Sequence, residues 1–231
     1  MLLKITIEGD EMRLRNIPEA EEIIKQHPEM ITMEAESWKG KWQERFPKKQ
    51  PLHLEVGSGR GRFIIEMAKR HPEINFIGME LQTSIIYKIL EKQRKEQLPN
   101  LQLLNGDATL LPEYFAAGEV DKLFLTFSDP WPKKKHAKRR LTHERFLTRF
   151  EEIVKAEGEL FFKTDNQALF EFSLMSLPNY GMIFEEIILD LHNSDQAEEN
   201  IMTEYEEKFS NQGFRIYQLK ARFPKRESKK A

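Results

Sequence analysis

The sequence predicts an α/β fold in which a mainly parallel sheet carries helices on both faces. From about Pro51 onward, short apolar runs alternate with segments whose apolar residues recur at three- and four-residue steps. This alternation is typical of βαβ units. The 231 residues suffice for one good-sized core, and 39% hydrophobic with 32% charged residues is typical of a soluble globular protein.

Seven apolar runs are the expected strands, and helical patterns lie between most of them. The strands are Leu52–Val56, Asn75–Glu80, Leu101–Asn105, Lys122–Phe127, Glu159–Thr164, Met182–Asp190 and Phe214–Ala221. The helices are Arg62–Arg70, Thr83–Gln97, His143–Val154 and Gln167–Ser176. The last two strands are separated only by an acidic loop from His192 to Glu207, so we expect this pair to be antiparallel.

The chain divides into three segments by composition. We expect residues 1–50 to form an N-terminal arm that packs on the core, with helices at Pro18–Gln26 and Trp38–Arg45. Residues 51–223 form the main domain, and residues 224–231 form a basic tail that either frays or adds nonspecific RNA affinity. Within the arm, Met1–Glu11 reads as an extension ahead of a start near Met12.

Composition excludes several classes of chemistry. The chain has no cysteine, so it has no disulfide framework, no thiol nucleophile and no thiolate metal site. Its histidines have no metal-ligand spacing, so we expect no metal. Because the chain shows no membrane-spanning run, signal peptide or other targeting signal, we expect a cytoplasmic protein; its oligomeric state stays open between monomer and homodimer.

One loop combines a carboxylate with a dense run of cations. Asp129 follows a strand, and prolines on either side of Trp131 restrict the loop that carries it. Seven of the eight residues in Lys133–Arg140 are basic if His136 is counted, although the whole chain has a formal net charge of -2. This local charge indicates a polyanionic partner that docks beside the carboxylate. Trp131 either stacks on a base or cofactor or wedges the loop against the core.

A glycine-rich turn follows the first strand, in Glu55-Val56-Gly57-Ser58-Gly59-Arg60-Gly61. A dinucleotide-binding fingerprint would require Gly or Ala where Arg62 stands, so that interpretation fails. The glycines still allow the backbone to approach a ligand closely. Glu55 beside them would repel a pyrophosphate and favour a cation.

Carboxylates stand at the carboxyl ends of four successive expected strands: Glu55, Glu80, Asp107 and Asp129. Ligands of open α/β sheets bind at this edge. S-adenosylmethionine fits such a site because it carries a sulfonium and an ammonium and no phosphate. Glu80 is placed to accept both hydroxyls of a ribose, and Asp107 to accept from an adenine amino group.

Several segments together resemble the bacterial tRNA (guanine-N7-)-methyltransferase family, over roughly Met12 to Phe223. They are the glycine-rich turn, Phe127-Ser128-Asp129-Pro130-Trp131-Pro132-Lys133-Lys134, His136, Lys138-Arg139-Arg140-Leu141, Phe162-Lys163-Thr164-Asp165-Asn166 and Met202-Thr203-Glu204-Tyr205-Glu206-Glu207-Lys208-Phe209. The resemblance implies a Rossmann-like S-adenosylmethionine-dependent methyltransferase fold. It also implies formation of 7-methylguanosine at position 46, in the variable loop of tRNA.

The resemblance also implies a role for each matching residue. Asp129 would be the active-site residue. The cofactor would contact Glu55, Gly57, Gly59, Gly61, Glu80, Asp107 and Asp129. The substrate would contact Lys133, Asp165, Thr203, Glu204, Tyr205 and Glu206. The RNA would lie on Lys135, His136, Lys138, Arg139 and Arg140. We expect Glu204, Glu206 or Asp165 to read the guanine edge, and Thr203 with Glu206 equally fits a helix-capping box.

Two other functions fit parts of the pattern. An acid followed by Pro-Pro-aromatic marks methyltransferases that act on exocyclic amines, but here Trp131 takes the second position after Asp129. A non-catalytic RNA-binding module on the same fold is the other alternative. The full set of cofactor-type acids and glycines argues against it.

Overall fold

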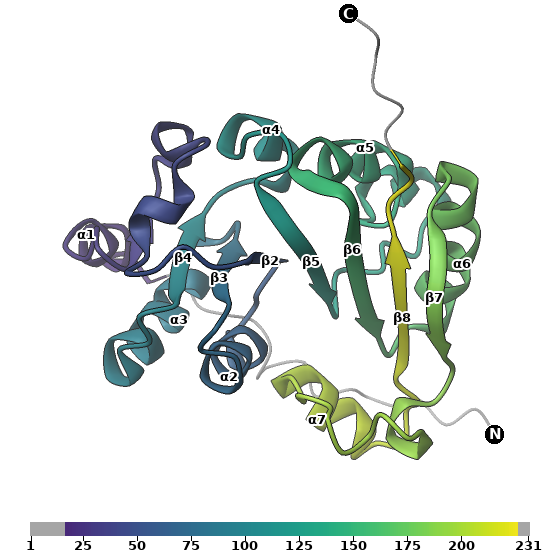
Figure 1. Ribbon diagram of the computed structural model, residues 1–231. Helices are drawn as coiled ribbons and strands as arrows, with labels where there is room; N and C mark the ends of the chain where they lie inside the picture. The colour runs from purple at the N-terminus through teal and green to yellow at the C-terminus, as the bar shows by residue number, and fades with distance from the viewer. Residues whose placement is uncertain (1–16, 226–231) are drawn as a thin grey trace, which may run out of the picture.

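The structure is a computed structural model that describes residues 17–225 (Figure 1). The extension Met1–Glu11 and residues 226–231 of the basic tail therefore lie outside the described residues. Within the described range, none of the helices combines the length and apolar character needed to cross a bilayer.

A single sheet forms the centre of the molecule. Across residues 17–225 it has eight strands in the order β1-β4-β3-β2-β5-β6-β8-β7. The strands are β1 (Ile31–Thr32), β2 (Leu52–Val56), β3 (Asn75–Glu80), β4 (Leu101–Asn105), β5 (Val120–Thr126), β6 (Val154–Thr164), β7 (Ile183–Ile188) and β8 (Tyr217–Arg222). Strands β1 to β6 pair in parallel, whereas β8 runs antiparallel to both β6 and β7. The predicted antiparallel pairing of the last two strands is confirmed.

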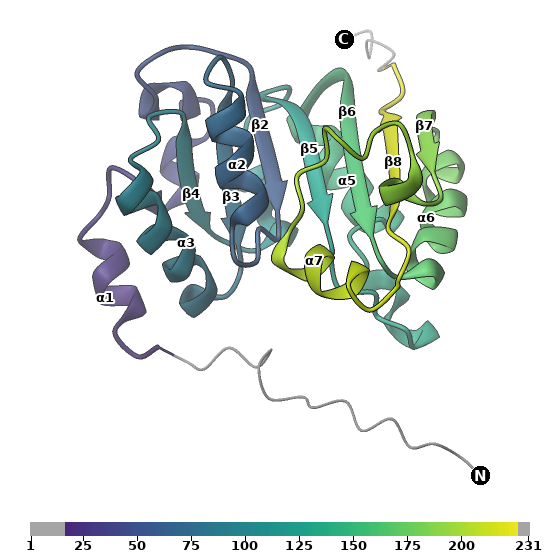
Figure 2. The same cartoon turned by 90° about the horizontal axis from the view of Figure 1, so that it is seen from below.

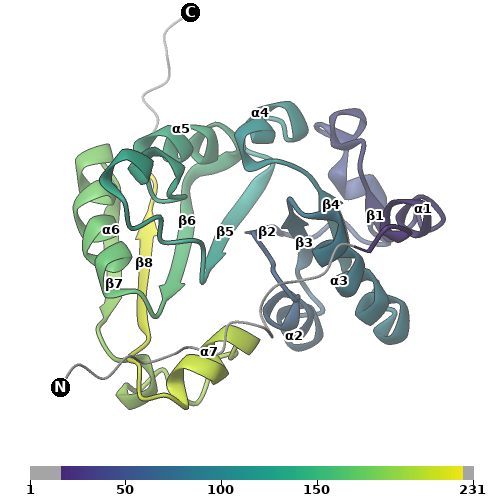
Figure 3. The ribbon, with the colours of Figure 1, turned by 180° about the vertical axis from the view of Figure 1, so that it is seen from behind.

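Helices cover both faces of the sheet, as predicted. They are α1 (Ala20–Lys25), α2 (Arg62–Arg70), α3 (Thr83–Glu96), α4 (Leu111–Tyr114), α5 (Glu144–Ile153), α6 (Gln167–Tyr180) and α7 (Glu204–Ser210). Short 3-10 helices are η1 (Ala35–Trp38), η2 (Trp42–Arg45), η3 (Ala108–Leu110), η4 (Lys134–Arg139) and η5 (Leu191–Asn193). Helices α2, α3 and α7 lie over one face (Figure 2), and α4, α5 and α6 over the other (Figure 3). Separate clusters of buried apolar side chains fill the two faces.

The N-terminal arm joins the sheet through β1, a strand that the sequence did not indicate because it has two residues. Trp42 anchors the following segment: it is fully buried, stacks on Phe115 at 5.1 Å, and donates from Nε1 to the carbonyl of Tyr114 at 2.9 Å. The predicted helix at Trp38–Arg45 is wrong, because Gly40 at φ +76° separates η1 from η2.

The acidic segment between the last two strands contains a helix that we expected to be absent. Helix α7 begins after Thr203. The Thr203 hydroxyl accepts from the backbone N–H of Glu206 at 3.0 Å. In return, the Glu206 carboxylate accepts from the backbone N–H of Thr203 at 3.4 Å. This reciprocal pair is the capping box that the sequence indicated. The prediction of a loop throughout His192–Glu207 is therefore wrong.

The topology brings the ends of distant strands together. The arrowheads of β2 to β6 point toward the same edge of the sheet (Figure 2), and α7 lies beside that edge. Because β2 is flanked by β3 and β5, the turns after these strands meet around the start of α2. This is the edge where open α/β sheets bind ligands.

Candidate active site

A cleft of about 440 Å³ opens at the carboxyl edge of the sheet. Gly57, Glu80, Asp129, Trp131 and Glu204 are among its lining residues. A smaller cleft of about 200 Å³ is lined by Asp107 among others. Gly57 and Arg139 line both clefts, so the two adjoin. Glu80, Asp129 and Asp107 thus line two adjoining clefts, whereas Glu55 is buried behind Thr126, which lines the larger one.

The glycine-rich turn needs its glycines for two different reasons. Gly57 adopts φ +81°, and open space surrounds the position where a side chain would begin, so backbone conformation alone selects glycine there. Gly61 adopts φ +80°, and an added Cβ would lie 2.6 Å from the Ile89 side chain of α3. The turn therefore lets α2 start in close contact with α3 while the backbone at Gly57 stays open to a ligand.

Glu55 is fully buried at the end of β2 and has one oxygen without a partner. Its Oε1 accepts from the Thr126 hydroxyl at 2.6 Å, whereas Oε2 has no hydrogen-bond partner. Burial raises the pKa of Glu55 to about 7, although the Thr126 hydroxyl and the charge of Lys163 act in the opposite direction. An unsatisfied buried carboxylate oxygen is costly, and a bound cation would remove that cost.

Glu80 and Asp107 both hold backbone N–H groups of the turns around the site. Glu80 accepts from the N–H of Gly59 and of Gln82, each at 3.1 Å, and burial raises its pKa. Asp107 Oδ1 accepts from the N–H of Thr109 at 2.8 Å and so caps η3. Each side chain lines a cleft while it orders a turn.

The loop that carries Asp129 is held in a strained conformation. Phe127 and Trp131 have positive φ angles of 53° and 43°, which non-glycine residues rarely adopt. Such strain is of the order of 1–3 kcal/mol per residue and persists only where surrounding contacts enforce it. Arg140 supplies such contacts: it donates to the carbonyls of Pro130 and Trp131, both at 3.1 Å, and lies 4.4 Å over the Phe172 ring. Asp129 itself is exposed in the cleft.

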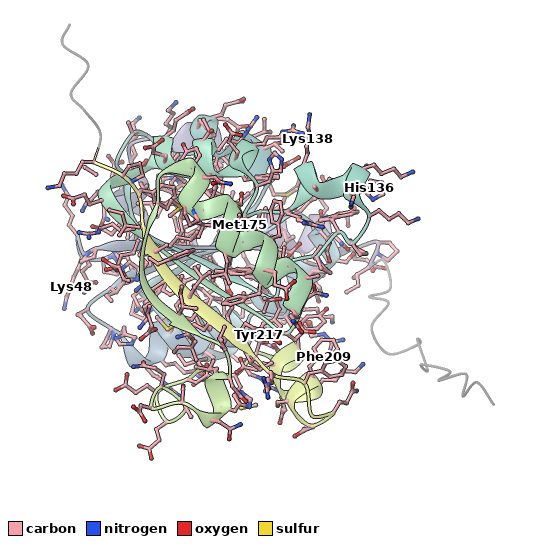
Figure 4. All side chains as sticks on the ribbon, turned by 90° about the vertical axis from the view of Figure 1, so that its right-hand side faces the viewer. Lys48, His136, Lys138, Met175, Phe209 and Tyr217 are labelled. Atoms are coloured by element: carbon pink, nitrogen blue, oxygen red, sulfur yellow. The ribbon has the colours of Figure 1, made fainter. Side chains whose placement is uncertain are left out.

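The cationic segment after this loop has an outer and an inner set of side chains. Lys135 and Lys138 are exposed, and His136 and Lys138 lie on η4 where it projects from the body of the molecule (Figure 4). Arg139 instead turns toward the cleft, where its guanidinium lies 4.8 Å over the Trp131 ring. Arg139 and Arg140 thus contact the loop that carries Asp129, whereas Lys135 and Lys138 stay exposed.

The residues predicted to contact substrate fall into two groups. Thr203, Glu204 and Tyr205 line the larger cleft, and Glu204 Oε1 accepts from Lys92 at 2.8 Å. Lys133 and Asp165 are absent from the described lining of both clefts, although Asp165 follows the end of β6.

Glu206 lies outside the cleft and is fully buried. Its carboxylate is 2.6 Å from Lys163 Nζ and also accepts from His192 Nε2 at 2.8 Å and Asn200 Nδ2 at 2.5 Å. Neither Glu206 nor Lys163 has any exposed side-chain surface. The prediction that Glu206 could read a guanine edge is therefore corrected, because four protein donors, counting the Thr203 N–H, already occupy its oxygens.

Sequence reasoning missed Thr126, Lys92, Lys163, His192 and Asn200 as parts of the site. One signal was present: Lys163 follows Phe161 and Phe162 in a strand where a lysine would be buried unless it were paired. The partners themselves come from distant segments, and no spacing rule connects them. Among the described residues, no group of three or more His, Asp or Glu side chains could hold a metal ion.

A family model described as "Putative methyltransferase" matches residues 49–219. A tRNA (guanine-N(7)-)-methyltransferase of Enterococcus faecalis is 58% identical over 212 residues, which cover 92% of this chain and 99% of that protein. One of Pediococcus pentosaceus is 55% identical over 212 residues, covering 92% of this chain and 100% of that protein. The chain belongs to the tRNA (guanine-N(7)-)-methyltransferase family.

Solved structures with low sequence identity share the fold of this family member. The structure titled "Crystal Structure of 16S rRNA Methyltranferase KamB" superposes with a TM-score of 0.60 at 15% identity, covering 79% of this chain and 90% of that one. The structure titled "Structure of an antibiotic related Methyltransferase" gives 0.59 at 19% identity, covering 78% and 90%. The predicted Rossmann-like methyltransferase fold is confirmed, with eight strands across residues 17–225 in place of the expected seven.

The residues of the site fit the methyl donor that such enzymes use. The unpartnered Glu55 Oε2 suits an ammonium, and the connected clefts extend from the glycine-rich turn past Glu80 to Asp107. No phosphate is required by this set of acids, and a phosphate would be repelled by it.

Replacement of Glu55 by glutamine should change stability and cofactor affinity in opposite directions. The folded-state pKa of Glu55, about 7, lies above its ordinary value of 4.5, so the stability of the cofactor-free protein falls as pH rises from about 4.5 to about 7 and levels off above that. At about 1.4 kcal/mol per pH unit, Glu55→Gln should gain at most about 3 kcal/mol at pH 8, and this gain should fade toward pH 5. Denaturant unfolding at both pH values measures it.

The same variant should bind S-adenosylmethionine at least about tenfold more weakly at pH 8, because a neutral amide replaces a carboxylate facing a cation. Isothermal titration calorimetry measures this affinity. Wild-type affinity in Glu55→Gln would show that Oε2 does not face the donor.

Replacement of Arg140 should lower turnover, whereas replacement of Lys138 should weaken RNA binding. Arg140→Ala frees the strained loop around Asp129, so kcat should fall by about tenfold or more. Lys138→Ala removes an exposed cation, so KM for tRNA should rise and the salt dependence of binding should drop by about one unit of slope. Steady-state kinetics at several salt concentrations separate these effects. Equal rises in the KM for tRNA in both variants would instead make Arg140 a phosphate contact.

Proposed function

We propose that this chain transfers the methyl group of S-adenosylmethionine to N7 of a guanine in tRNA, at position 46 of the variable loop. The observation that carries the proposal is the buried carboxylate of Glu55, which has one unpartnered oxygen and whose partner Thr126 lines the same cleft as Glu80 and Asp129, beside a projecting cationic segment. Membership of the tRNA (guanine-N(7)-)-methyltransferase family supports the same reaction.

Three acids suit the separate parts of the donor. Glu55 would hold its ammonium, Glu80 would accept from its ribose hydroxyls, and Asp107 would accept from its adenine amine. Glu80 and Asp107 are already fixed by bonds from backbone N–H groups, so their remaining acceptor sites are preorganised.

When bound, S-adenosylmethionine supplies an electrophilic methyl group on a sulfonium. Guanine N7 has a free lone pair and no proton, so the protein needs no base to activate it. Positive charge passes from the donor to the purine ring during the in-line transfer. Asp129, exposed in the cleft on a conformationally restricted loop, would stabilise that charge as it arrives.

We assign recognition of the guanine edge to Glu204. Its carboxylate lines the cleft, is 20% exposed and is oriented by Lys92. Guanine N1–H and its exocyclic amine are neighbouring donors that one carboxylate can accept together. The base would leave its stack to reach the cleft, while phosphates bind the exposed lysines of the cationic segment.

The experiment is incubation of the purified chain with tRNA transcripts and labelled S-adenosylmethionine, followed by mapping of the modified nucleoside. We expect 7-methylguanosine at position 46. Methylation of an exocyclic amine, or none at all, would overturn the proposal. With inosine at the target, which lacks the exocyclic amine, the wild type should lose activity; loss of this discrimination in Glu204→Gln would confirm the assigned contact.

Replacement of Asp129 should affect the chemical step far more than donor binding. Asp129→Asn keeps the size of the side chain and removes the charge that faces the transferred methyl group. Single-turnover rates should fall by about a hundredfold or more, and the Kd for S-adenosylmethionine should rise by no more than about threefold. Equal losses in both measurements would make Asp129 a binding residue only.

A further inference from the structure

We infer that the buried ion pair between Lys163 and Glu206 is a positioning device: it fixes the substrate-facing turn Thr203–Tyr205 against the sheet and thereby sets how well tRNA is used. This inference rests on the proposed function and extends it to residues outside the cleft. Lys163 belongs to β6 and Glu206 to the first turn of α7, so the pair joins the sheet to the turn that lines the cleft.

Helix α7 lacks the apolar anchor that usually holds a surface helix. Within α7, all of which the structure describes, Glu206 is the buried residue. The helix has seven residues, too few for stability without tertiary contacts. The fully buried side chain through which it meets the sheet is therefore a charged one.

The network around this carboxylate fixes direction as well as distance. Lys163 Nζ contacts Glu206 at 2.6 Å and also donates to Asn200 Oδ1 and to the carbonyl of Ile201, both at 2.8 Å. Asn200 and His192 in turn donate to Glu206 Oε1, and the Thr203 N–H donates to Oε2. Because donors approach both oxygens from different segments, the helix cannot rotate without breaking hydrogen bonds in a buried site.

The outer side of the turn is tied to the glycine-rich loop. Glu204 accepts from Lys92 at 2.8 Å, and Lys92 also donates to the carbonyl of Arg60 at 2.6 Å. Arg62 pairs with Glu207 at 2.7 Å. These contacts are partly exposed and contribute little alone, so the buried pair determines where Glu204 and Tyr205 stand in the cleft.

The charge of the pair serves position more than stability. Replacing a buried ion pair by apolar residues is often neutral or stabilising, whereas removing one partner is strongly destabilising. An apolar pair, however, has no directional bonds that would define the rotation of α7. When both residues are replaced by apolar ones, we therefore expect stability to be kept while the KM for tRNA rises.

The primary test is Glu206→Gln, which keeps the side-chain size but presents an amide N–H to Lys163 or His192. We expect KM for tRNA to rise by about tenfold or more while the Kd for S-adenosylmethionine stays within about threefold. The matched control is Val120→Ala at the amino end of β5, a fully buried position remote from the cleft. It should lower the melting temperature without changing KM. A normal KM in Glu206→Gln, with only a lowered melting temperature, would overturn the inference.

Two further variants separate positioning from stability. The double variant Lys163→Met/Glu206→Leu should regain most of the thermal stability lost in Lys163→Met but keep the raised KM for tRNA. His192→Gln retains an N–H donor to Glu206 and should keep KM within about twofold, whereas His192→Leu should raise it severalfold. A double variant with wild-type KM would show that the pair is only structural.

Hydrogen exchange tests the anchor without any substrate. Backbone amides of α7 should exchange about tenfold faster in Glu206→Gln than in the wild type, while those of α2 should be unchanged. If the wild type does not methylate tRNA, the proposed function fails. Unchanged amide exchange of α7 in Glu206→Gln would independently refute the role of the Lys163–Glu206 pair in holding α7.

Discussion

A single buried lysine lies within electrostatic range of two buried carboxylates, and the arrangement of the site depends on it. Lys163 contacts Glu206 directly at 2.6 Å and lowers the pKa of Glu55 through its charge, although burial still raises that pKa to about 7. Glu206 is paired by this lysine, whereas one buried oxygen of Glu55 has no hydrogen-bond partner. Under the proposed function a cationic ligand would compensate that second carboxylate.

A second constraint joins RNA docking to the reactive loop. The cationic segment would be a separate binding surface if all its side chains faced outward, but Arg140 donates to two carbonyls of the loop and Arg139 stacks on Trp131. A phosphate bound to the outer lysines would therefore act on the same short segment that holds Asp129. These contacts hold Trp131 in its positive-φ conformation, so this part of the loop is preorganised before any ligand arrives.

The sequence predicts those parts of this structure that depend on local signals. Strands β2, β3 and β4 and helix α2 have the expected bounds, because apolar runs end at glycines, acids or helix starts. The eighth strand was missed because β1 has two residues, and α7 was indicated only by the capping box at its start because it has no apolar stripe. Acids at strand ends could be assigned to one edge from topology alone. The role of Glu206 could not, because its burial depends on Lys163, 43 residues earlier in the chain, and on two loop side chains.

The proposed methyl transfer would explain why the site holds positioned carboxylates and needs no general base. Guanine N7 offers a lone pair without a proton, so proton transfer contributes nothing, and the remaining barrier is one of alignment and of moving positive charge. A fixed acid near the path, Asp129, would favour that charge at each stage, and a second acid, Glu204, would hold the base by its donors. Both tasks fail if the acids shift by a fraction of a hydrogen-bond length. Such a reaction requires its acids to be held in position. The hydrogen bonds from Arg140 to the Asp129 loop and the buried pair of Lys163 with Glu206 would do this.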